Sequence, residues 1–533
     1  MYIEPENKHK KSINLKSMFS KTPLISRAIF FLLFLSFFFH SCNTAGIDYS
    51  IEYTLNPYKI APLTALLDIK TDKPCKASFK VLGNDPIKQS FETSSTVLSI
   101  PVVGLYPNSL NDVEVTLDFE GGQVIDIIQI KTAALPDYFP AIVINKIDRT
   151  KMEDGLHAMD IHFANFGKFR SVPIIFDDKG LIRWYLDLSF HGSMVSPFQK
   201  MKDGNILVVG RHTIYEFDML GRPLKKNEIS TNYGMHHEVL ELPNEDLLIA
   251  VGKRNAYMQI DGKRLLSDSD FMIHYNRKQN KILKEWDLAK HLDVSRDDLN
   301  FFRDGDWLHM NALDFDPRDS TIIVSGRNQG LLKVSWNDEL KWIMSPKQNW
   351  GKSGRDGNGY DTKPFLLTAI NKEGKPYSSE VQTGNESTDE FDFPWGPHAP
   401  ELLPNGNIIV FDNGPFRNYN NENNYSRAVE YKVNEENKTF EQVWEYGKSR
   451  GTKFFSSIVS DVDYLSNSNN ILITSGFLHP NSNHSAKIVE VSPEDSTEVF
   501  EATIFLKDVN KGGKPGWGQS DVLYRSERMP LKY

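Results

Sequence analysis

The stretch ELLPNGNIIVFDNG, residues 401–414, has the pattern of a β-hairpin, with a tight polar turn followed by an apolar strand. A second pattern, in which a polar turn breaks a pair of strands, alternates with it and occurs six times between residues 176 and 502. Four antiparallel strands per unit, repeated along a chain, are typical of a β-propeller. The hairpin pattern of residues 401–414, which we call the hairpin frame, recurs in four other segments. These are KMKDGNILVVGRH (200–212), ELPNEDLLIAVGKR (241–254), FDPRDSTIIVSGRN (315–328) and YLSNSNNILITSGF (464–477).

We therefore predict an all-β fold in which residues 137–533 form a six-bladed β-propeller. A sandwich of stacked hairpins is the alternative, but a frame kept over most of the chain favours the propeller. Residues 46–136 consist of short alternating strands separated by turn residues, which predicts a small immunoglobulin-like β-sandwich in front of it. Residues 288–302, LAKHLDVSRDDLNFF, have helical spacing and predict a short helix on a loop.

The N-terminus has the organisation of a secretory leader over residues 1–42. A basic region is followed by an apolar stretch of about twelve residues, which is too short to span a bilayer of ~30 Å as a permanent helix. Cys42 follows the small residue Ser41, as the acceptor cysteine does in a bacterial lipoprotein box, so we expect lipidation there. We expect an exported protein of a Gram-negative bacterium, periplasmic or anchored in the outer membrane; an uncleaved anchor and plain secretion are the alternatives.

Composition narrows the class of partner. The chain has 533 residues, a net charge of −9 and no basic run outside the N-terminus, which argues against nucleic acid as a partner. We therefore expect contact with a membrane only through the N-terminal lipid anchor. A homodimer is compatible with the sequence, which does not fix the oligomeric state.

The hairpin frame places polar residues at equivalent points of different blades. Six residues before the turn proline of each hairpin stand His398, His237 and Asn311, and the same count in the fourth hairpin reaches Ser460. His309 lies two residues before Asn311 and is expected on the same face of its strand. Because inner strands of a propeller line the central channel, these side chains should meet at its mouth.

Of the adjacent pair His236 and His237, the frame selects His237, and in a regular strand the two side chains should point to opposite faces. Arg327 ends the outgoing strand of its hairpin and should lie beside His309, while Arg211 and Lys253 end their strands in the same way. We predict a channel mouth rich in histidines and cations.

This set of side chains favours an oxyanion as the ligand. Arginine offers paired donors to two oxygens, and the Asn311 amide and the histidine rings add further N–H groups. A zinc or copper site would instead combine several histidines with carboxylates or cysteines, and a guanidinium would oppose the metal charge. We therefore expect no metal and no other cofactor.

Four motifs resemble the bacterial aryl-sulfate sulfotransferases, which are exported six-bladed propellers with an N-terminal β-domain. They are MHHEVLELPN (235–244), DWLHMNALDFDPRDSTIIVSGRNQG (306–330), PWGPHAPELLPNGNIIVFDNG (394–414) and SDVLYRSERMPL (520–531). The resemblance implies transfer of a sulfuryl group from a phenolic sulfate ester to a phenol acceptor by a ping-pong mechanism, without a nucleotide sulfate donor. No phosphate-binding P-loop motif occurs in the chain, which agrees with this.

By this resemblance His398 is the nucleophile, which carries the sulfuryl group transiently as a sulfohistidine. It must be neutral to attack, and cationic surroundings would favour this by lowering its pKa. Pro397 and Pro400 are expected to hold its ring in place by limiting backbone freedom. The residues that match the family's sulfuryl-binding positions are His237, His309, Asn311 and Arg327, and Tyr524 resembles a site tyrosine of the family. Either His237 or His309 could protonate the leaving phenol and later deprotonate the acceptor.

Two other functions remain open at the level of sequence. One is a binding propeller at the cell envelope that recognises a sulfated or other anionic ligand without converting it. The other is a metal-dependent enzyme. A covalent sulfated form of the protein would exclude the first, and stoichiometric zinc or copper in the purified protein would favour the second.

Overall fold

A computed structural model describes residues 46–164, 170–189, 198–297, 305–422, 424–479, 482–507 and 518–533. The predicted leader, including Cys42, lies outside these ranges. Within them, no helix is both long and apolar enough to cross a membrane. The regular structure of the described chain consists almost entirely of strands, with only short helical turns, so the all-β prediction is confirmed.

The N-terminal domain is one five-stranded antiparallel sheet. Its long strand β2 pairs with β3 along most of its length, with β1 through its first half and with β4 through its second half. The register between β2 and β3 shifts after Lys70. Alternate side chains of β2, such as Leu67 and Phe79, are buried, as expected for strands with one inward face. The strands are β1 (Tyr49–Leu55), β2 (Thr64–Val81), β3 (Ile87–Val103), β4 (Leu110–Phe119) and β5 (Gly122–Lys131).

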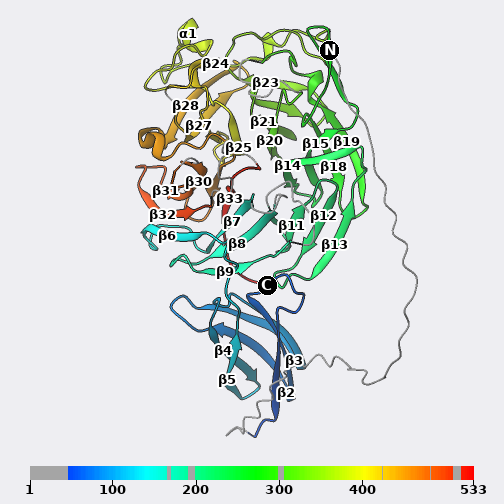
Figure 1. Cartoon of the computed structure of the whole chain (residues 1–533), viewed down its shortest axis with the longest axis vertical. Coiled ribbons are helices and arrows are strands. Elements are labelled where there is room, and N and C mark those ends of the chain that lie inside the picture. The colour runs from blue at the N-terminus through cyan, green and yellow to red at the C-terminus, as the bar shows by residue number, and fades with distance from the viewer. Residues whose placement is uncertain are drawn as a thin grey trace, which may run out of the picture.

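Beyond residue 140 the described chain forms six sheets of four or five strands, arranged around a central axis (Figure 1). The inner strands β14, β20, β25, β29 and β33 contact one another around that axis. From the inner strand outwards, the sheets are β33 (Val522–Met529), β7 (Leu156–Phe163), β8 (Arg170–Phe176), β9 (Ile182–Tyr185); β10 (Gln199–Lys200), β11 (Ile206–Val209), β12 (Thr213–Phe217), β13 (Pro223–Glu228); β14 (Tyr233–Glu241), β15 (Leu247–Lys253), β18 (Phe271–Asn276), β19 (Lys281–Asp287); β20 (Met310–Asp316), β21 (Thr321–Gly326), β22 (Gly330–Ser335), β23 (Leu340–Met344); β25 (Pro397–Leu402), β26 (Ile408–Asp412), β27 (Arg427–Asn434), β28 (Thr439–Tyr446), β24 (Thr368–Ala369); and β29 (Asp461–Leu465), β30 (Asn470–Leu478), β31 (Ser485–Val491), β32 (Glu498–Phe505), β6 (Ala141–Ile147).

Both ends of the propeller sequence close the ring. The C-terminal strand β33 is the inner strand of the sheet whose outer strands are β7, β8 and β9. Strand β6, from the start of the propeller, is the outermost strand beside β32. The last strand of the chain therefore reaches the central channel and brings Tyr524 to it.

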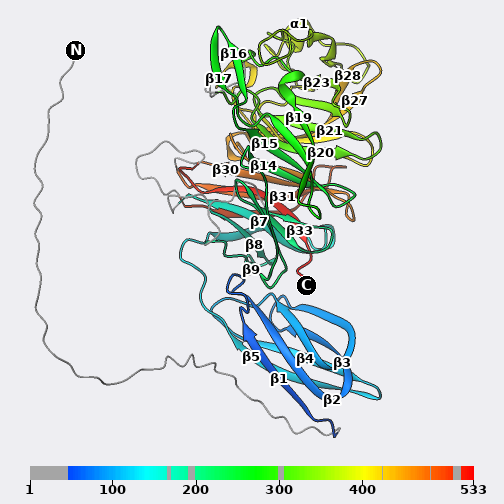
Figure 2. The ribbon, with the colours of Figure 1, turned by 90° about the vertical axis from the view of Figure 1, so that its right-hand side faces the viewer.

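The N-terminal domain packs below the sheet that contains β9 (Figure 2). The guanidinium of Arg183 in β9 is fully buried, donates to the carbonyl oxygens of Gly104 and Asp85, and lies 3.6 Å from the ring centroid of Tyr106. One buried apolar cluster contains residues of both the N-terminal domain and the propeller. The two domains therefore share a core.

Few elements depart from this pattern. The predicted helix over 288–302 is wrong for its described part, where only the 3₁₀ turn η1 (Leu288–Lys290) forms. The Asp293 carboxylate accepts from the backbone amides of Ser295 and Gly351, which stabilises a turn in place of a helix. The remaining elements are β16 (Tyr257–Ile260), β17 (Lys263–Leu266), η2 (Lys363–Phe365), α1 (Ser379–Gln382), η3 (Arg417–Tyr419) and η4 (Lys448–Lys453).

Candidate active site

All six predicted site residues of the propeller lie together at one end of the central channel. The ring centroid of His237 is 5.2 Å from that of His309 and 5.6 Å from that of Tyr524. The backbone amide of Arg327 donates to the carbonyl oxygen of His309 at 3.1 Å. These contacts join residues of three different sheets. The members of the cluster are His237, His309, Asn311, Arg327, His398 and Tyr524.

The inner strands are interrupted by β-bulges at the level of this cluster. Such bulges re-aim side chains and are frequent beside active sites. Positive φ angles of 55° at His237 and 49° at His309 show the same departure from regular strand geometry. The bulges lie between Met235 and Val239 in β14, Met310 and Ala312 in β20, His398 and Glu401 in β25, and Leu523 and Arg525 in β33.

The bulge in β14 overturns one prediction. His236 and His237 were expected on opposite faces of a regular strand, but their ring centroids are only 3.8 Å apart. The left-handed φ of His237 turns the backbone, so that His236 also lies 5.5 Å from the ring of His309. His236 is therefore a site residue that the strand pattern rejected, and only the identical side chain next to His237 could have indicated it.

His398 is 4% exposed and has a strongly perturbed pKa. Burial, followed by the cationic Arg327 and the neighbouring His309, lowers its pKa to about 3. Its ring is therefore neutral at pH 7. The sequence analysis expected cationic surroundings to cause this shift, but burial is the larger cause. Nδ1 of His398 lies 2.5 Å from Oδ1 of Asn413, a contact that the sequence analysis did not anticipate.

The peptide in front of His398 is held by the neighbouring sheet. The carbonyl oxygen of Pro397 accepts hydrogen bonds from Nδ2 of Asn311 and from the hydroxyl of Ser325, both at 2.8 Å. One N–H of the Asn311 amide is thus used to position the strand of His398. Asn311 and Ser325 are both at most 1% exposed, so water does not compete for these bonds.

Arg327 links three parts of the site. Its Nη2 donates to the carbonyl oxygen of Ser457 at 3.2 Å. Its aliphatic part lies close to Gly396, because a Cβ built on that glycine would be 3.9 Å from Cγ of Arg327. Burial lowers the pKa of the guanidinium to about 10, so it stays cationic at neutral pH. A buried guanidinium beside neutral histidines attracts an anion.

His309 has a carboxylate partner that the sequence analysis missed. Its Nδ1 lies 2.5 Å from Oδ2 of Asp306, and this hydrogen bond helps to hold the pKa of that carboxyl below its usual value against the effect of burial. Asn328 donates to the backbone carbonyl of Asp306 at 2.8 Å and fixes the turn. In the sequence, only the spacing of three residues between Asp306 and His309 could have indicated this contact. That spacing predicts a contact only when the conformation of the turn is known.

Burial also lowers the pKa of His237 far below its ordinary value, with the surrounding histidines as the next causes. The ring of Tyr524 stacks on that of His162, with 5.4 Å between the ring centroids. Burial raises the pKa of Tyr524, so Tyr524 and His237 are both neutral. Glu238 is paired with Arg525 at 2.8 Å and turns away from the histidines. Positive charge therefore comes from Arg327, as an anion site requires.

Two cations that the strand ends predicted for the mouth are outside the cluster. Lys253 pairs with Glu285 at 2.7 Å, and Tyr233 donates to the same carboxylate. Arg211 is exposed to solvent. Of the three cations that end outgoing strands, Arg327 lies in the cluster. The strand of Lys253 ends beside an acidic neighbour and Arg211 is exposed.

Below the histidine cluster the channel contains a cavity of about 230 Å³ with an acidic lining. Burial raises the pKa of Glu401 to about 8, that of Glu527 to about 7 and that of Asp314 to about 6. These carboxyls hold protons at or near neutral pH, which limits the negative charge under the site. Within the described part of the chain, no group of three or more histidine, cysteine, aspartate or glutamate side chains is arranged to hold a metal ion.

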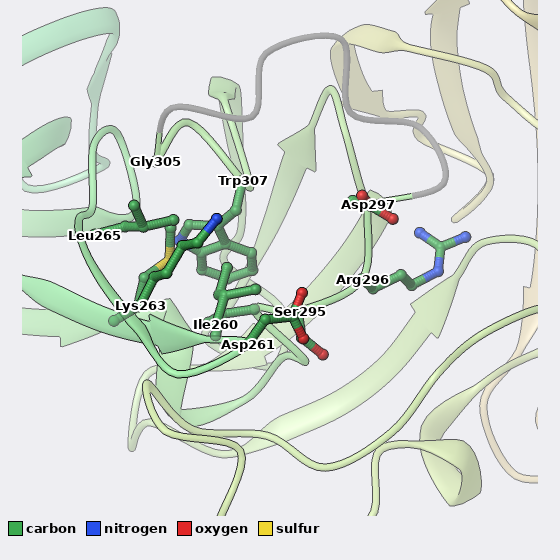
Figure 3. A pocket seen from close by; sticks show the side chains of 11 residues that line it. Ile260, Asp261, Lys263, Leu265, Ser295, Arg296, Asp297, Gly305 and Trp307 are labelled. Carbon is green, nitrogen blue, oxygen red and sulfur yellow. The ribbon is translucent and has the colours of Figure 1, made fainter.

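A second cavity, of about 260 Å³, lies beside the β16–β17 hairpin (Figure 3). Lys263, Trp307 and Arg296 line it, together with apolar side chains such as Leu265. None of the predicted site residues is among its lining residues.

The fold and the site together define a propeller protein with a buried cluster of histidines, one arginine and one asparagine at its central axis. The family model described as Arylsulfotransferase (ASST) matches residues 142–512, and the model of the Arylsulfotransferase Ig-like domain matches residues 52–133. The chain belongs to the arylsulfotransferase family. It is accordingly an aryl-sulfate sulfotransferase, and the second match confirms the immunoglobulin-like character of the N-terminal domain.

Two relatives extend over most of the chain. The arylsulfate sulfotransferase AssT of Escherichia coli O6:H1 is 28% identical over 517 residues, which cover 80% of this chain and 84% of the relative. The arylsulfate sulfotransferase AssT of Lelliottia amnigena is 28% identical over 547 residues, which cover 85% of this chain and 88% of the relative. Similarity thus includes both domains.

Proposed function

We propose that this protein transfers a sulfuryl group from a phenolic sulfate ester to a phenol in two steps, with a sulfohistidine at His398 between them. The observation that carries the proposal is the state of His398, a neutral imidazole buried beside the guanidinium of Arg327. A neutral imidazole is a nucleophile, and the guanidinium can neutralise the sulfuryl oxygens of the substrate.

In the first step a ring nitrogen of His398 attacks sulfur, and the S–O bond to the aryl group breaks. By analogy with phosphoryl transfer, the transition state is loose and places charge on the non-bridging oxygens and on the leaving phenolate. Arg327 and the second N–H of Asn311 hold the non-bridging oxygens, so positioning and electrostatic stabilisation supply most of the rate.

His309 is assigned the proton transfers, because its ring is hydrogen-bonded to a carboxylate, that of Asp306. The carboxylate stabilises the imidazolium, which protonates the leaving phenolate. In the second step the neutral ring takes the proton from the acceptor phenol, whose oxygen attacks sulfur and releases His398. His309 thus acts as the general acid in the first step and as the general base in the second.

The direct test is the covalent intermediate. Mixing the enzyme with a chromogenic phenyl sulfate in the absence of acceptor should add one sulfuryl group to the protein, measured by intact mass, and the group should leave when phenol is added. The His398→Ala variant should show neither the mass gain nor turnover. Wild-type turnover in this variant would refute the assignment of the nucleophile, whereas binding without turnover in the wild-type protein would favour a binding propeller.

We also propose that the protein is exported and anchored by a lipid on Cys42. The proposal is supported by the basic and apolar leader in front of that cysteine. Metabolic labelling with a radioactive or clickable fatty acid should label the wild-type protein in its native host and should not label the Cys42→Ala variant. Equal labelling of both proteins would contradict the assignment.

A further inference from the structure

The side chain of Asn413 makes a buried contact with the nucleophile of the proposed reaction. Asn413 directly follows strand β26, and His398 lies on the paired strand β25 opposite Phe411. Oδ1 of Asn413 is 2.5 Å from Nδ1 of His398, and the two residues are 0% and 4% exposed. Solvent therefore does not replace this hydrogen bond.

The direction of this bond follows from the rest of the amide. Nδ2 of Asn413 lies 2.6 Å from the carbonyl oxygen of Ser456 and 3.0 Å from that of Val459. Carbonyl oxygens only accept hydrogen bonds, so the NH₂ group must face them and the amide oxygen must face His398. That oxygen also only accepts, so the proton of the neutral His398 ring has to be on Nδ1.

We infer that Asn413 is a positioning residue that holds His398 as the Nδ1–H tautomer and leaves the lone pair of Nε2 to attack sulfur. This inference deepens the proposed function and rests on it. It assigns the residue that fixes the tautomer and the orientation of the nucleophile.

The tautomer has a chemical consequence in both steps. When Nε2 bonds to sulfur and the S–O bond breaks, the electron pair goes to the phenolate oxygen, which takes its proton from His309. The sulfurylated ring keeps its Nδ1 proton and becomes cationic, and Asn413 Oδ1 accepts a stronger, charge-assisted bond from it. When the acceptor oxygen attacks, the N–S bond breaks, its electron pair returns to Nε2, and the ring is neutral with the same Nδ1 proton.

The backbone of Asn413 is held rigidly enough to serve this purpose. The hydroxyl of Ser426 donates to the carbonyl oxygen of Asn413 at 2.6 Å and accepts from the amide of Ser456 at 2.8 Å. The preceding Asp412 is paired with two buried arginines, Arg417 at 2.9 Å and Arg427 at 2.8 Å. The amide therefore has one position relative to His398.

The tautomer can be measured without turnover. Long-range ¹H–¹⁵N correlation spectra of ¹⁵N-histidine-labelled protein distinguish a protonated from an unprotonated ring nitrogen, and comparison with His398→Ala assigns the signals. We expect the Nδ1–H form for His398 in the wild-type protein and a mixture that includes Nε2–H in Asn413→Leu. An Nε2–H form in active wild-type enzyme would overturn the inference while leaving the proposed function in place.

Kinetics give a second, independent readout. Asn413→Leu removes the acceptor, and kcat/KM for phenyl sulfate should fall on the order of 100-fold. Asn413→Asp keeps an acceptor and adds a charge. The charged or titratable groups beside His398 include Arg327, His309 and His237, none of which is a carboxylate. The new carboxylate should therefore raise the pKa of His398 and move the acid limb of kcat/KM upward by about 1–3 pH units.

Ser426→Ala is the matched control, because it disturbs the same loop without contacting His398. It should keep the wild-type position of the acid limb and the Nδ1–H tautomer, even if its melting temperature falls. If Asn413→Asp and Ser426→Ala lost activity equally and neither moved the limb, Asn413 would be a structural residue and the inference would be wrong.

Discussion

Replacing Asp306 by asparagine removes the carboxylate that accepts the Nδ1 proton of His309. The two atoms are 2.5 Å apart, and the side chains of Asp306 and His309 are 24% and 19% exposed, so the bond is charge-assisted and only partly screened. Such a bond contributes about 2 kcal/mol, which corresponds to a rate loss of roughly 30-fold when proton transfer to the leaving group limits the rate.

The assay is a series of phenyl sulfates whose phenols differ in acidity. A 4-nitrophenolate leaves without help, so Asp306→Asn should lower kcat/KM for its sulfate ester by less than about threefold, while the unsubstituted phenyl sulfate should show the full loss. Asp268→Asn is the matched control, because Asp268 is an exposed carboxylate that acts on the same group of histidines without a hydrogen bond to His309.

A uniform loss across the series in Asp306→Asn would refute the assignment of His309 as the general acid. It would mean that the carboxylate does not assist proton transfer to the leaving group. Its role would then be structural, for example in holding the turn that also carries Trp307. Equal behaviour of the Asp268→Asn variant would lead to the same conclusion, since a distant charge would then have the same effect as the direct bond.

Two further predictions follow from buried charges. Arg327→Met should lower kcat/KM on the order of 10²–10³-fold, because the sulfuryl oxygens lose their cation, while the exposed Arg318→Met should keep wild-type activity. The ordinary pKa of Glu401 is 4.5 and its folded pKa is about 8, so with rising pH the unfolded chain releases this proton first and stability falls across that window. Glu401→Gln should therefore match the wild-type melting temperature near pH 4 and exceed it by about 2 °C or more near pH 8, and an equal difference at both values would contradict the assigned shift.

Much of the fold could be predicted because strands and turns leave local marks. The recurring hairpin frame and the alternation in residues 46–136 depend on neighbours within a few residues, so they are visible in the sequence. The helix expected at 288–302 failed because the side chain of Asp293 is committed to the amide of Gly351, 58 residues away. A contact of that range leaves no periodic signal.

The candidate site was predicted unevenly for the same reason. His398, His237 and Asn311 share an offset from a turn, and Arg327 ends a strand, so the repeat placed them in one region. His236 was rejected because a regular strand was assumed, and the bulge in β14 brings it beside His237. Bulges are fixed by the packing of neighbouring strands and cannot be counted from a hairpin turn.

The residue types of the site and the repeat that carries them can be recognised locally, because each blade encodes its own strands and turns. Which nitrogen and oxygen atoms meet depends on how the whole chain folds. The C-terminal strand β33 brings Tyr524 to the channel by closing the ring, and the partners of Asn413 come from the next sheet. Hydrogen bonds between sheets depend on how the ring closes, and ring closure is a property of the whole chain.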